Sequence, residues 1–317
     1  MPSVEGDMDR FEPLLAESVI IGDAFLDQVT THLLTAGGKR LRPLLAIASA
    51  TGGEREASQE DLLGGVSLEL MHLASLYHDD VMDEATMRRN VESVNSRFGN
   101  LVAIVAGDFL MARSAAIAAD LGTEVAGLLA RTLALLTRGQ VSEVRTAFDV
   151  TRSVDDYYEA ISGKTAALMA SSCRVGGLTS NASSDHIEAL TAFGHELGLV
   201  FQLRDDILDI TAVDGQLGKP AGQDLAEGIY TYPCLVALDD PKVGQELREL
   251  LGSPLDETSR ERARSMVVAT DGIAASLLEA KRHIDAAVAA ADALPVAPLR
   301  RGFTDLATSL IEGLPEA

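Results

Sequence analysis

The chain has 317 residues, a formal net charge of −22 and 47% hydrophobic residues, with only 4% aromatic residues. A uniformly acidic surface repels nucleic acid and anionic lipid, so the composition argues against a nucleic-acid-binding protein. Cys173 and Cys234 lack a metal-like spacing and fit the core of a reduced, cytoplasmic protein. The acidic N-terminus does not resemble a signal peptide, and no apolar stretch is expected to approach the ~20 residues of a membrane span.

Proline placement and apolar periodicity predict an all-α chain. No proline occurs between Pro43 and Pro220, and apolar residues recur three and four apart across much of that stretch. Strand-type alternation is weak and no linker stands out, so we expect a single domain over residues 1–317. Gly215 to Glu227 is the most loop-like interior segment. Helices are predicted at roughly 8–35, 43–51, 62–82, 101–120, 123–148, 154–179, 187–210, 230–239, 256–268, 271–292 and 296–313.

The sharpest feature is a DDxxD motif that occurs twice, each time toward the C-terminal end of a long apolar helix. The first copy runs from Asp79 to Asp83, and the second runs from Asp205 to Asp209. Positions i and i+4 share one helix face, so the outer carboxylates of each copy point the same way. Like charges at the negative end of a helix dipole are locally unfavourable, and such a violation at two sites tends to mark function.

Paired carboxylates at two helix ends indicate divalent-metal binding. Carboxylate oxygens suit Mg²⁺, which takes one or two carboxylates together with water and substrate phosphate. An exposed acidic helix end is the alternative interpretation in a protein this acidic. An HD-type phosphohydrolase with His78-Asp79 as its signature is another, but that chemistry needs further His ligands and the chain has six His in all.

Basic segments stand out against the acidic background. The segment Gly37 to Pro43, with sequence GGKRLRP, joins two flexible glycines to three cations and a proline that can start a helix. This combination predicts an anion site, and a solvated turn is the alternative. Weaker basic motifs follow at Arg88-Arg89, at Gly163-Lys164-Thr165 inside a predicted helix break, and at Gly218 to Asp224.

With these motifs in order, the chain resembles the trans-prenyltransferases, also called polyprenyl synthetases. The likeness rests on both DDxxD motifs together with GKRLRP, GKT, FQLRDD and GKPAGQD. It implies the all-α isoprenoid-synthase helical bundle, with a central cavity between the two DDxxD-bearing helices. It also implies Mg²⁺-dependent sequential condensation of isopentenyl diphosphate with an allylic diphosphate, namely farnesyl or geranylgeranyl diphosphate.

The resemblance implies a role for each residue that matches a family motif. The direct ligands of three Mg²⁺ ions would be Asp79, Asp83 and Asp205. The residues that support these ions or bind them through water would be Asp80, Asp206 and Asp209. The isopentenyl diphosphate site would comprise Lys39, Arg42, His72 and Arg89. The allylic diphosphate site would comprise Arg88, Lys164, Thr165, Gln202 and Lys219. Asn90 departs from the pattern, because the family often has Gly after the arginine pair.

Charge neutralisation accounts for the implied reaction. Diphosphate leaves once Mg²⁺ and basic side chains balance its charge, and the isopentenyl double bond then attacks the allylic cation at short range. The released diphosphate would accept the proton that is lost. An apolar, water-excluding cavity would protect the cation from hydrolysis.

Product length is expected to depend on Ala74 and Ser75, about one turn before Asp79. Because both side chains are small, a growing prenyl tail could pass along this helix face. We therefore expect a product of about six to ten isoprene units, suited to a quinone side chain. Small residues also permit close helix packing, so a geranylgeranyl or farnesylgeranyl diphosphate product is the alternative.

The same residues bear on rival functions and on partners. A terpene cyclase or a head-to-head condensing enzyme gives no reason to expect the basic cluster at Lys39 to Arg42. A non-catalytic regulatory subunit should have lost aspartates or lysines, and this chain keeps them. The resemblance implies a homodimer, with the apolar helices between Leu101 and Phe148 as its candidate interface. We expect no nucleic-acid partner and no stable membrane insertion.

Overall fold

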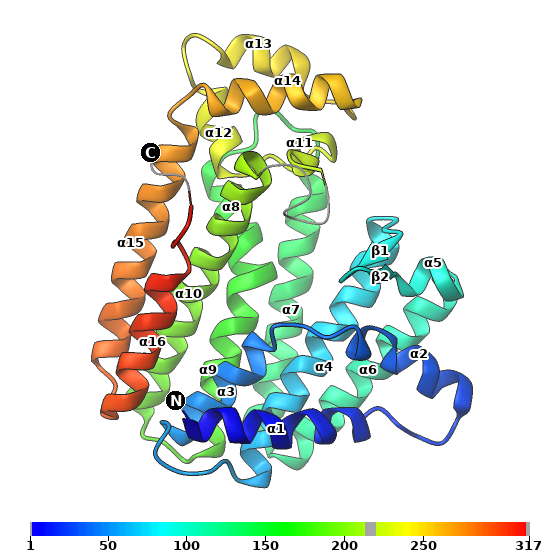
Figure 1. Ribbon diagram of the computed structural model, residues 1–317, viewed down its shortest axis with the longest axis vertical. Coiled ribbons are helices and arrows are strands. Elements are labelled where there is room, and N and C mark those ends of the chain that lie inside the picture. Colours follow the sequence, from blue (N-terminus) through cyan, green and yellow to red (C-terminus); the bar gives the residue numbers. More distant parts are fainter. Residues whose placement is uncertain (1, 213–219, 315–317) are drawn as a thin grey trace. The chain divides into compact units, whose positions relative to one another are not determined.

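The computed structural model describes residues 2–212 and 220–314, which are mainly helical with very little strand (Figure 1). The α-helices are α1 (Pro2–Glu17), α2 (Ala24–Thr35), α3 (Leu41–Thr51), α4 (Gln59–Met82), α5 (Val94–Phe98), α6 (Asn100–Asp120), α7 (Thr123–Arg145), α8 (Val154–Ile161), α9 (Ala167–Thr179), α10 (Ser184–Thr211), α11 (Gln223–Ala226), α12 (Tyr232–Leu238), α13 (Gly244–Leu250), α14 (Glu257–Val268), α15 (Gly272–Asp292) and α16 (Ala297–Ser309). A π-helix, η1 (Ser162–Ala166), joins α8 to α9. An antiparallel hairpin of β1 (Met87–Arg88) and β2 (Val91–Glu92) follows α4.

The all-α prediction is confirmed, with local differences that have physical causes. The predicted helix over 8–35 is two helices, because Asp23 caps a new start by accepting from the N–H groups of Phe25 and Leu26. The predicted break at Gly163 is a π-helix, so the helical path continues through it. The short elements α5, α11, α13 and the hairpin were not predicted, since they are too short to carry a clear apolar period.

The chain forms two compact units. The first draws on Met1–Leu133, Leu168–Gly194 and Ala291–Gly302, and the second on Ala134–Ala167, His195–Ala290 and Phe303–Ala317. The expectation of a single domain over residues 1–317 stays a prediction.

Helix α4 carries the first acidic motif and packs against α1, α3, α5 and α6 within the first unit. Its start is fixed by a capping box in which Ser58 and Asp61 satisfy each other's backbone N–H groups. Leu62, Val66 and Leu70 are buried, in agreement with the predicted periodicity. The far end of the helix therefore projects its aspartates from a rigid, packed element.

The second unit has an apolar core built from α8, α10, α12 and the helices that follow. Tyr157, Leu203 and Tyr230 are among its fully buried members. Close backbone contact adds to this packing, because a Cβ on Gly163 would lie 2.7 Å from the carbonyl oxygen of Leu135. The π-helix is therefore held tightly against α7.

Helix α6 overturns one expectation. It is long and apolar enough to cross a membrane by length and composition, although no such stretch was expected from the sequence. Asp108 interrupts the apolar run without making the whole helix polar. In the first unit the helix packs against α4 and buries Ala103, Ala106 and Leu110.

Candidate active site

The first acidic motif lies at the end of α4, as predicted. Asp83 follows the last helical residue and its N–H donates to the carbonyl oxygen of Asp79 at 2.8 Å. The two outer aspartates therefore sit one helical turn apart. Asp79 is half-buried and Asp83 is exposed, so both are accessible to a ligand from solvent.

The middle aspartate of this motif plays a different part. Asp80 is fully buried, and its Oδ1 accepts from Nε of Arg88 at 2.7 Å and from Nη2 at 2.6 Å. Burial raises the pKa of Asp80, and the Arg88 guanidinium opposes that rise. Its Oδ2 is also buried and has no hydrogen-bond partner among the described residues. Asp80 thus fixes Arg88 at the end of α4 and keeps one oxygen for another donor or a cation.

The hairpin sets the direction of the arginine pair. Arg88 pairs with Val91 across the strands, which leaves Arg89 and Asn90 as a two-residue turn. Both turn residues have positive φ, 52° and 62°, as a type I′ turn requires. Asn tolerates this backbone region better than most residues, which explains how Asn90 can replace the glycine common in the family.

Arg40 does not belong to an open anion site. It is buried and forms ion pairs with Glu12 at 2.8 Å and with Glu69 at 2.9 Å. Of the three predicted cations in this segment, Arg40 therefore serves the fold, because removing it would leave the buried Glu69 carboxylate without its partner. Lys39 remains exposed beside it.

Arg42, His72 and Arg89 form a basic cluster within the first unit. Burial lowers the pKa of Arg42 to about 10; the Glu69 carboxylate opposes this fall, and the nearby Arg89 adds a smaller lowering effect. Burial and the neighbouring arginines also hold the pKa of His72 well below its usual value, so its imidazole is neutral. Arg89 donates to the carbonyl oxygens of Gly37 and Leu33, which ties the hairpin turn to the glycine loop. Like charges held together in this way favour an anionic ligand.

The second acidic motif lies in the last turns of α10. The side chain of Asp205 is 45% exposed and contacts Arg204, whereas Asp206 is buried. Tyr157 donates to Oδ2 of Asp206 at 2.6 Å, and Gln202 donates to its Oδ1 at 2.9 Å. Burial raises the pKa of Asp206 to about 8, against the effect of these two donors.

Asp209 joins α10 to the GQD segment. Its carbonyl oxygen accepts from the N–H of Gly222 at 2.7 Å, and its Oδ2 accepts from the N–H of Asp224 at 3.3 Å. The buried Asp209 thus supports the chain that follows the motif. Lys219, which was assigned to the allylic diphosphate, lies outside the described residues.

The GKT motif lies on the π-helix, a form that often occurs at functional sites. Lys164 Nζ donates to Oε1 of Glu143 on α7 at 2.5 Å. Thr165 donates to Oε1 of Gln202 at 2.8 Å, and Gln202 in turn donates to Asp206. Hydrogen bonds therefore connect Thr165, Gln202 and Asp206 as one network within the second unit.

The donor chemistry of both motifs fits a hard divalent cation. No group of three or more His, Cys, Asp or Glu side chains converges closely enough to hold a metal among residues 2–212 and 220–314. Mg²⁺ does not require such a group, because it is usually bound by one or two carboxylates, water and substrate phosphate. The accessible oxygens of Asp79, Asp83 and Asp205 and the buried Oδ2 of Asp80 suit that role.

Three contributing residues were missed by the sequence analysis. Tyr157 and Glu143 lie far in sequence from the side chains that they bind, and Glu69 lies far from Arg40. No local sequence spacing predicts these contacts. A partial signal was present for Tyr157, which lies seven residues before Lys164 at a helical interval.

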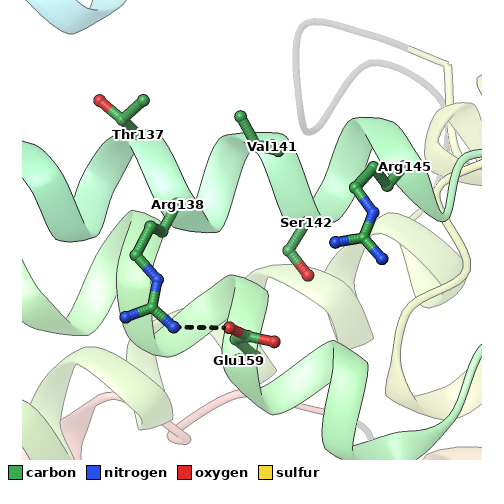
Figure 2. Close-up of a pocket in the computed structure, with 6 residues that line it drawn as sticks. All are labelled: Thr137, Arg138, Val141, Ser142, Arg145 and Glu159. Atoms are coloured by element: carbon green, nitrogen blue, oxygen red, sulfur yellow. Dashed lines mark hydrogen bonds and ion pairs between the residues drawn. The ribbon is translucent and has the colours of Figure 1, made fainter.

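A cavity of about 300 Å³ lies elsewhere in the second unit (Figure 2). It is lined by Thr137, Arg138, Val141, Ser142, Arg145 and Glu159. Figure 2 shows Arg138 of α7 paired with Glu159 of α8, a contact of 3.0 Å between two exposed side chains. None of the residues assigned from the sequence lines this cavity.

Tyr157→Phe should destabilise the protein, because Asp206 would lose a buried hydrogen-bond donor. We expect a loss of about 1–3 kcal/mol in the free energy of unfolding, measured by urea denaturation. Tyr232→Phe is the control, since it removes a half-buried hydroxyl from the same aromatic cluster. Equal losses in the two variants would contradict the role given to Tyr157.

Comparison with known proteins identifies the family of the chain. The polyprenyl synthetase family model matches residues 23–268. The chain is 38% identical to a nonaprenyl diphosphate synthase of Mycobacterium tuberculosis, over 86% of this chain and 82% of the relative. It is 37% identical to heptaprenyl diphosphate synthase component 2 of Geobacillus stearothermophilus, over 97% of this chain and 93% of the relative.

Two solved structures share the fold. A decaprenyl diphosphate synthase from Rhodobacter capsulatus matches with a TM-score of 0.92 and 31% identity, covering 99% of this chain and 98% of that one. A geranylgeranyl pyrophosphate synthase from Corynebacterium glutamicum, complexed with calcium and isoprenyl diphosphate, matches with a TM-score of 0.87 and 37% identity, covering 99% and 96%. The isoprenoid-synthase fold expected from the sequence is confirmed. The chain therefore belongs to the polyprenyl synthetase family of prenyltransferases.

Proposed function

We propose that this chain is a trans-polyprenyl diphosphate synthase that condenses isopentenyl diphosphate sequentially with farnesyl or geranylgeranyl diphosphate. The observation that carries the proposal is the repeated construction of the two acidic motifs. In each, the middle aspartate is buried and tied to neighbouring side chains, while the first aspartate stays accessible. This arrangement suits the gathering of cations around a substrate diphosphate.

Asp79, Asp83 and Asp205 would hold Mg²⁺, as many as three ions per active site, with Asp80, Asp206 and Asp209 supporting them. When bound, the cations would supply the positive charge that makes diphosphate a good leaving group. The protein contributes side chains that are already held in place around the metal-binding aspartates. Arg88 and Asp80, and likewise Tyr157 and Asp206, are already in contact before substrate arrives.

The basic cluster of the first unit would bind isopentenyl diphosphate. Lys39 is exposed, and Arg89 is close enough to Arg42 for its charge to act to lower the pKa of Arg42. A diphosphate would relieve that repulsion and accept hydrogen bonds from both guanidinium groups. His72 is neutral and can donate a hydrogen bond to the same ligand.

The allylic diphosphate would meet Arg88, Lys164, Thr165 and Gln202, with Lys219 also assigned to it. Lys164 is paired with Glu143 at 2.5 Å, so its ammonium would exchange this partner for a phosphate oxygen. Thr165 and Gln202 are linked by a hydrogen bond and would stay fixed during the exchange. The released diphosphate can then take up the proton that is lost from the isopentenyl unit.

Incubation of the protein with farnesyl diphosphate, labelled isopentenyl diphosphate and Mg²⁺ should give labelled polyprenyl diphosphate. Asp79→Asn should lower kcat by about 10²–10³-fold, because it removes a charge that acts on the leaving group. Asp120→Asn, at an exposed aspartate at the end of α6, is the control and should keep full activity. A folded wild-type protein that incorporates no label would favour a non-catalytic regulatory subunit instead.

Ala74 and Ser75 differ in what they allow. Ala74 is fully buried, so a larger side chain there would overpack the first unit. Ser75 is half-buried, and its hydroxyl donates to the carbonyl oxygen of His72 at 2.8 Å. We therefore assign the control of product length mainly to Ser75, with a long-chain product of about six to ten isoprene units for a quinone side chain.

Ser75→Phe should shorten the product while isopentenyl incorporation continues, because a bulky ring would block the path of the prenyl tail. Chromatography of the dephosphorylated products measures this directly. Ser75→Thr adds one methyl group and should leave the distribution near that of the wild type. A wild-type product of four or five units would instead support the geranylgeranyl or farnesylgeranyl alternative, for which the 37% identical geranylgeranyl pyrophosphate synthase is a precedent.

We also propose that the enzyme is a cytoplasmic homodimer without stable membrane insertion. Helix α6 exposes Leu101, Ile104 and Val105, and the exposed fraction of Leu101 reaches 75%. A contiguous apolar face of this kind usually marks an association surface. The relative named heptaprenyl diphosphate synthase component 2 suggests a different subunit as the other candidate partner.

Val105→Glu should convert the dimer to a monomer, because it places a charge in the apolar contact. Sedimentation velocity of the purified chain measures the change. Leu278→Glu is the matched control, since Leu278 is 68% exposed on α15. A wild-type chain that sediments as a monomer would contradict the homodimer.

A further inference from the structure

A chain of polar contacts in the second unit reaches the π-helix from α15. Ser162 Oγ lies 3.1 Å from Nε2 of His195, and Nδ1 of His195 lies 3.4 Å from Oε1 of Glu196. The other carboxylate oxygen of Glu196 lies 2.6 Å from Nδ1 of His283. We call Ser162, His195, Glu196 and His283 the relay.

The far end of the relay is anchored on α15 and α8. His283 is 4% exposed, and its Nε2 lies 3.0 Å from Nη2 of Arg282 and 3.4 Å from the hydroxyl of Tyr158. Tyr158 donates to Glu279 at 3.0 Å. The α15 residues of this anchor lie beyond the 23–268 range that the family model matches, whereas Tyr158 on α8 lies within it.

The charge on Glu196 sets the direction of the hydrogen bonds. Burial acts to raise the pKa of Glu196, but the hydrogen bonds from His195 and His283 outweigh it and hold the pKa at about 2. An ionised carboxylate accepts only, so both imidazoles donate to it through Nδ1. In the neutral imidazole with its proton on Nδ1, Nε2 of His195 is the acceptor for the hydroxyl of Ser162.

The π-helix needs such support. A π turn is rare and persists where tertiary contacts over-determine it. On one side, Gly163 packs against Gly139 so closely that an added Cβ would lie 3.0 Å from the Gly139 Cα. On the other side, Ser162 is held by His195. Return to an α turn would rotate the following residues by about 100° about the helix axis.

We propose that the relay is a positioning device that holds the π-helix in register and so aims Lys164 at the allylic diphosphate. Lys164 lies two residues after Ser162, so a change of register would move its ammonium to another face of the helix. The proposal rests on the proposed function of Lys164. The isopentenyl diphosphate site draws on other residues, which makes the two substrates separate reporters.

A nucleophilic role for Ser162 does not fit the backbone. The order Ser162, His195, Glu196 has the connectivity of a nucleophilic triad. The N–H of Ser162 donates to the carbonyl oxygens of Glu159 and Tyr158. The N–H of Ala167 donates to the carbonyl oxygen of Ser162. These N–H groups are used by the helix, so they cannot stabilise an oxyanion.

The first test separates the Michaelis constants of the two substrates. His195→Leu and Ser162→Ala should raise KM for farnesyl diphosphate about three- to tenfold and leave KM for isopentenyl diphosphate within about twofold. His195→Gln should restore most of the loss, because an amide can still accept from Ser162. Lys281→Ala, an exposed position on α15, is the control. Equal changes in both constants, or no change in either, would overturn the proposal.

The second test does not depend on activity. Hydrogen exchange of the amides over residues 162–167 should be faster in His195→Leu and Ser162→Ala than in the wild type, and unchanged in Lys281→Ala. Unchanged exchange in the relay variants would overturn the positioning role. If the wild type showed no incorporation but the exchange rates changed as expected, the relay would stand and the proposed function would fail.

Discussion

The central constraint on this structure is the placement of several carboxylates at the negative end of a helix. Aspartates at such positions repel one another and the helix dipole. Both acidic motifs meet this constraint in the same way, since the middle aspartate is buried and hydrogen-bonded. Asp80 is held by Arg88, and Asp206 is held by Tyr157 and Gln202. The first aspartate of each motif is left accessible to a cation, which would complete the neutralisation.

The basic side chains are also divided between two roles, since some stabilise the fold and others are placed to bind diphosphate. Arg40 forms ion pairs with Glu12 and with the buried Glu69, and these contacts fix the loop that precedes α3. Arg42 and Arg89 lie close together and share the field of Glu69, whose carboxylate is already paired with Arg40, a condition that favours diphosphate. In the second unit, Lys164 is paired with Glu143, and Gly163 of its π-helix packs closely against α7.

Much of the fold and of the motif placement could be predicted from the sequence, because long helices carry a strong apolar period. The one-turn spacing of Asp79 and Asp83 followed directly from helix geometry. The hairpin could not be predicted, since two-residue strands carry no period. Glycine is the usual sequence signal for a positive φ, and the turn has Asn90 instead. Contacts such as Tyr157 to Asp206 depend on tertiary packing over 49 residues of chain, which no local pattern encodes.

The most direct test of the central claim is the binding of a non-reactive allylic thiolodiphosphate, measured by calorimetry with and without Mg²⁺. The account predicts tight binding only with Mg²⁺, weakened at least about tenfold by Asp79→Asn and, separately, by Asp205→Asn. Binding of equal strength without Mg²⁺, or insensitivity to either substitution, would contradict the claim that both acidic motifs act on substrate diphosphate through metal.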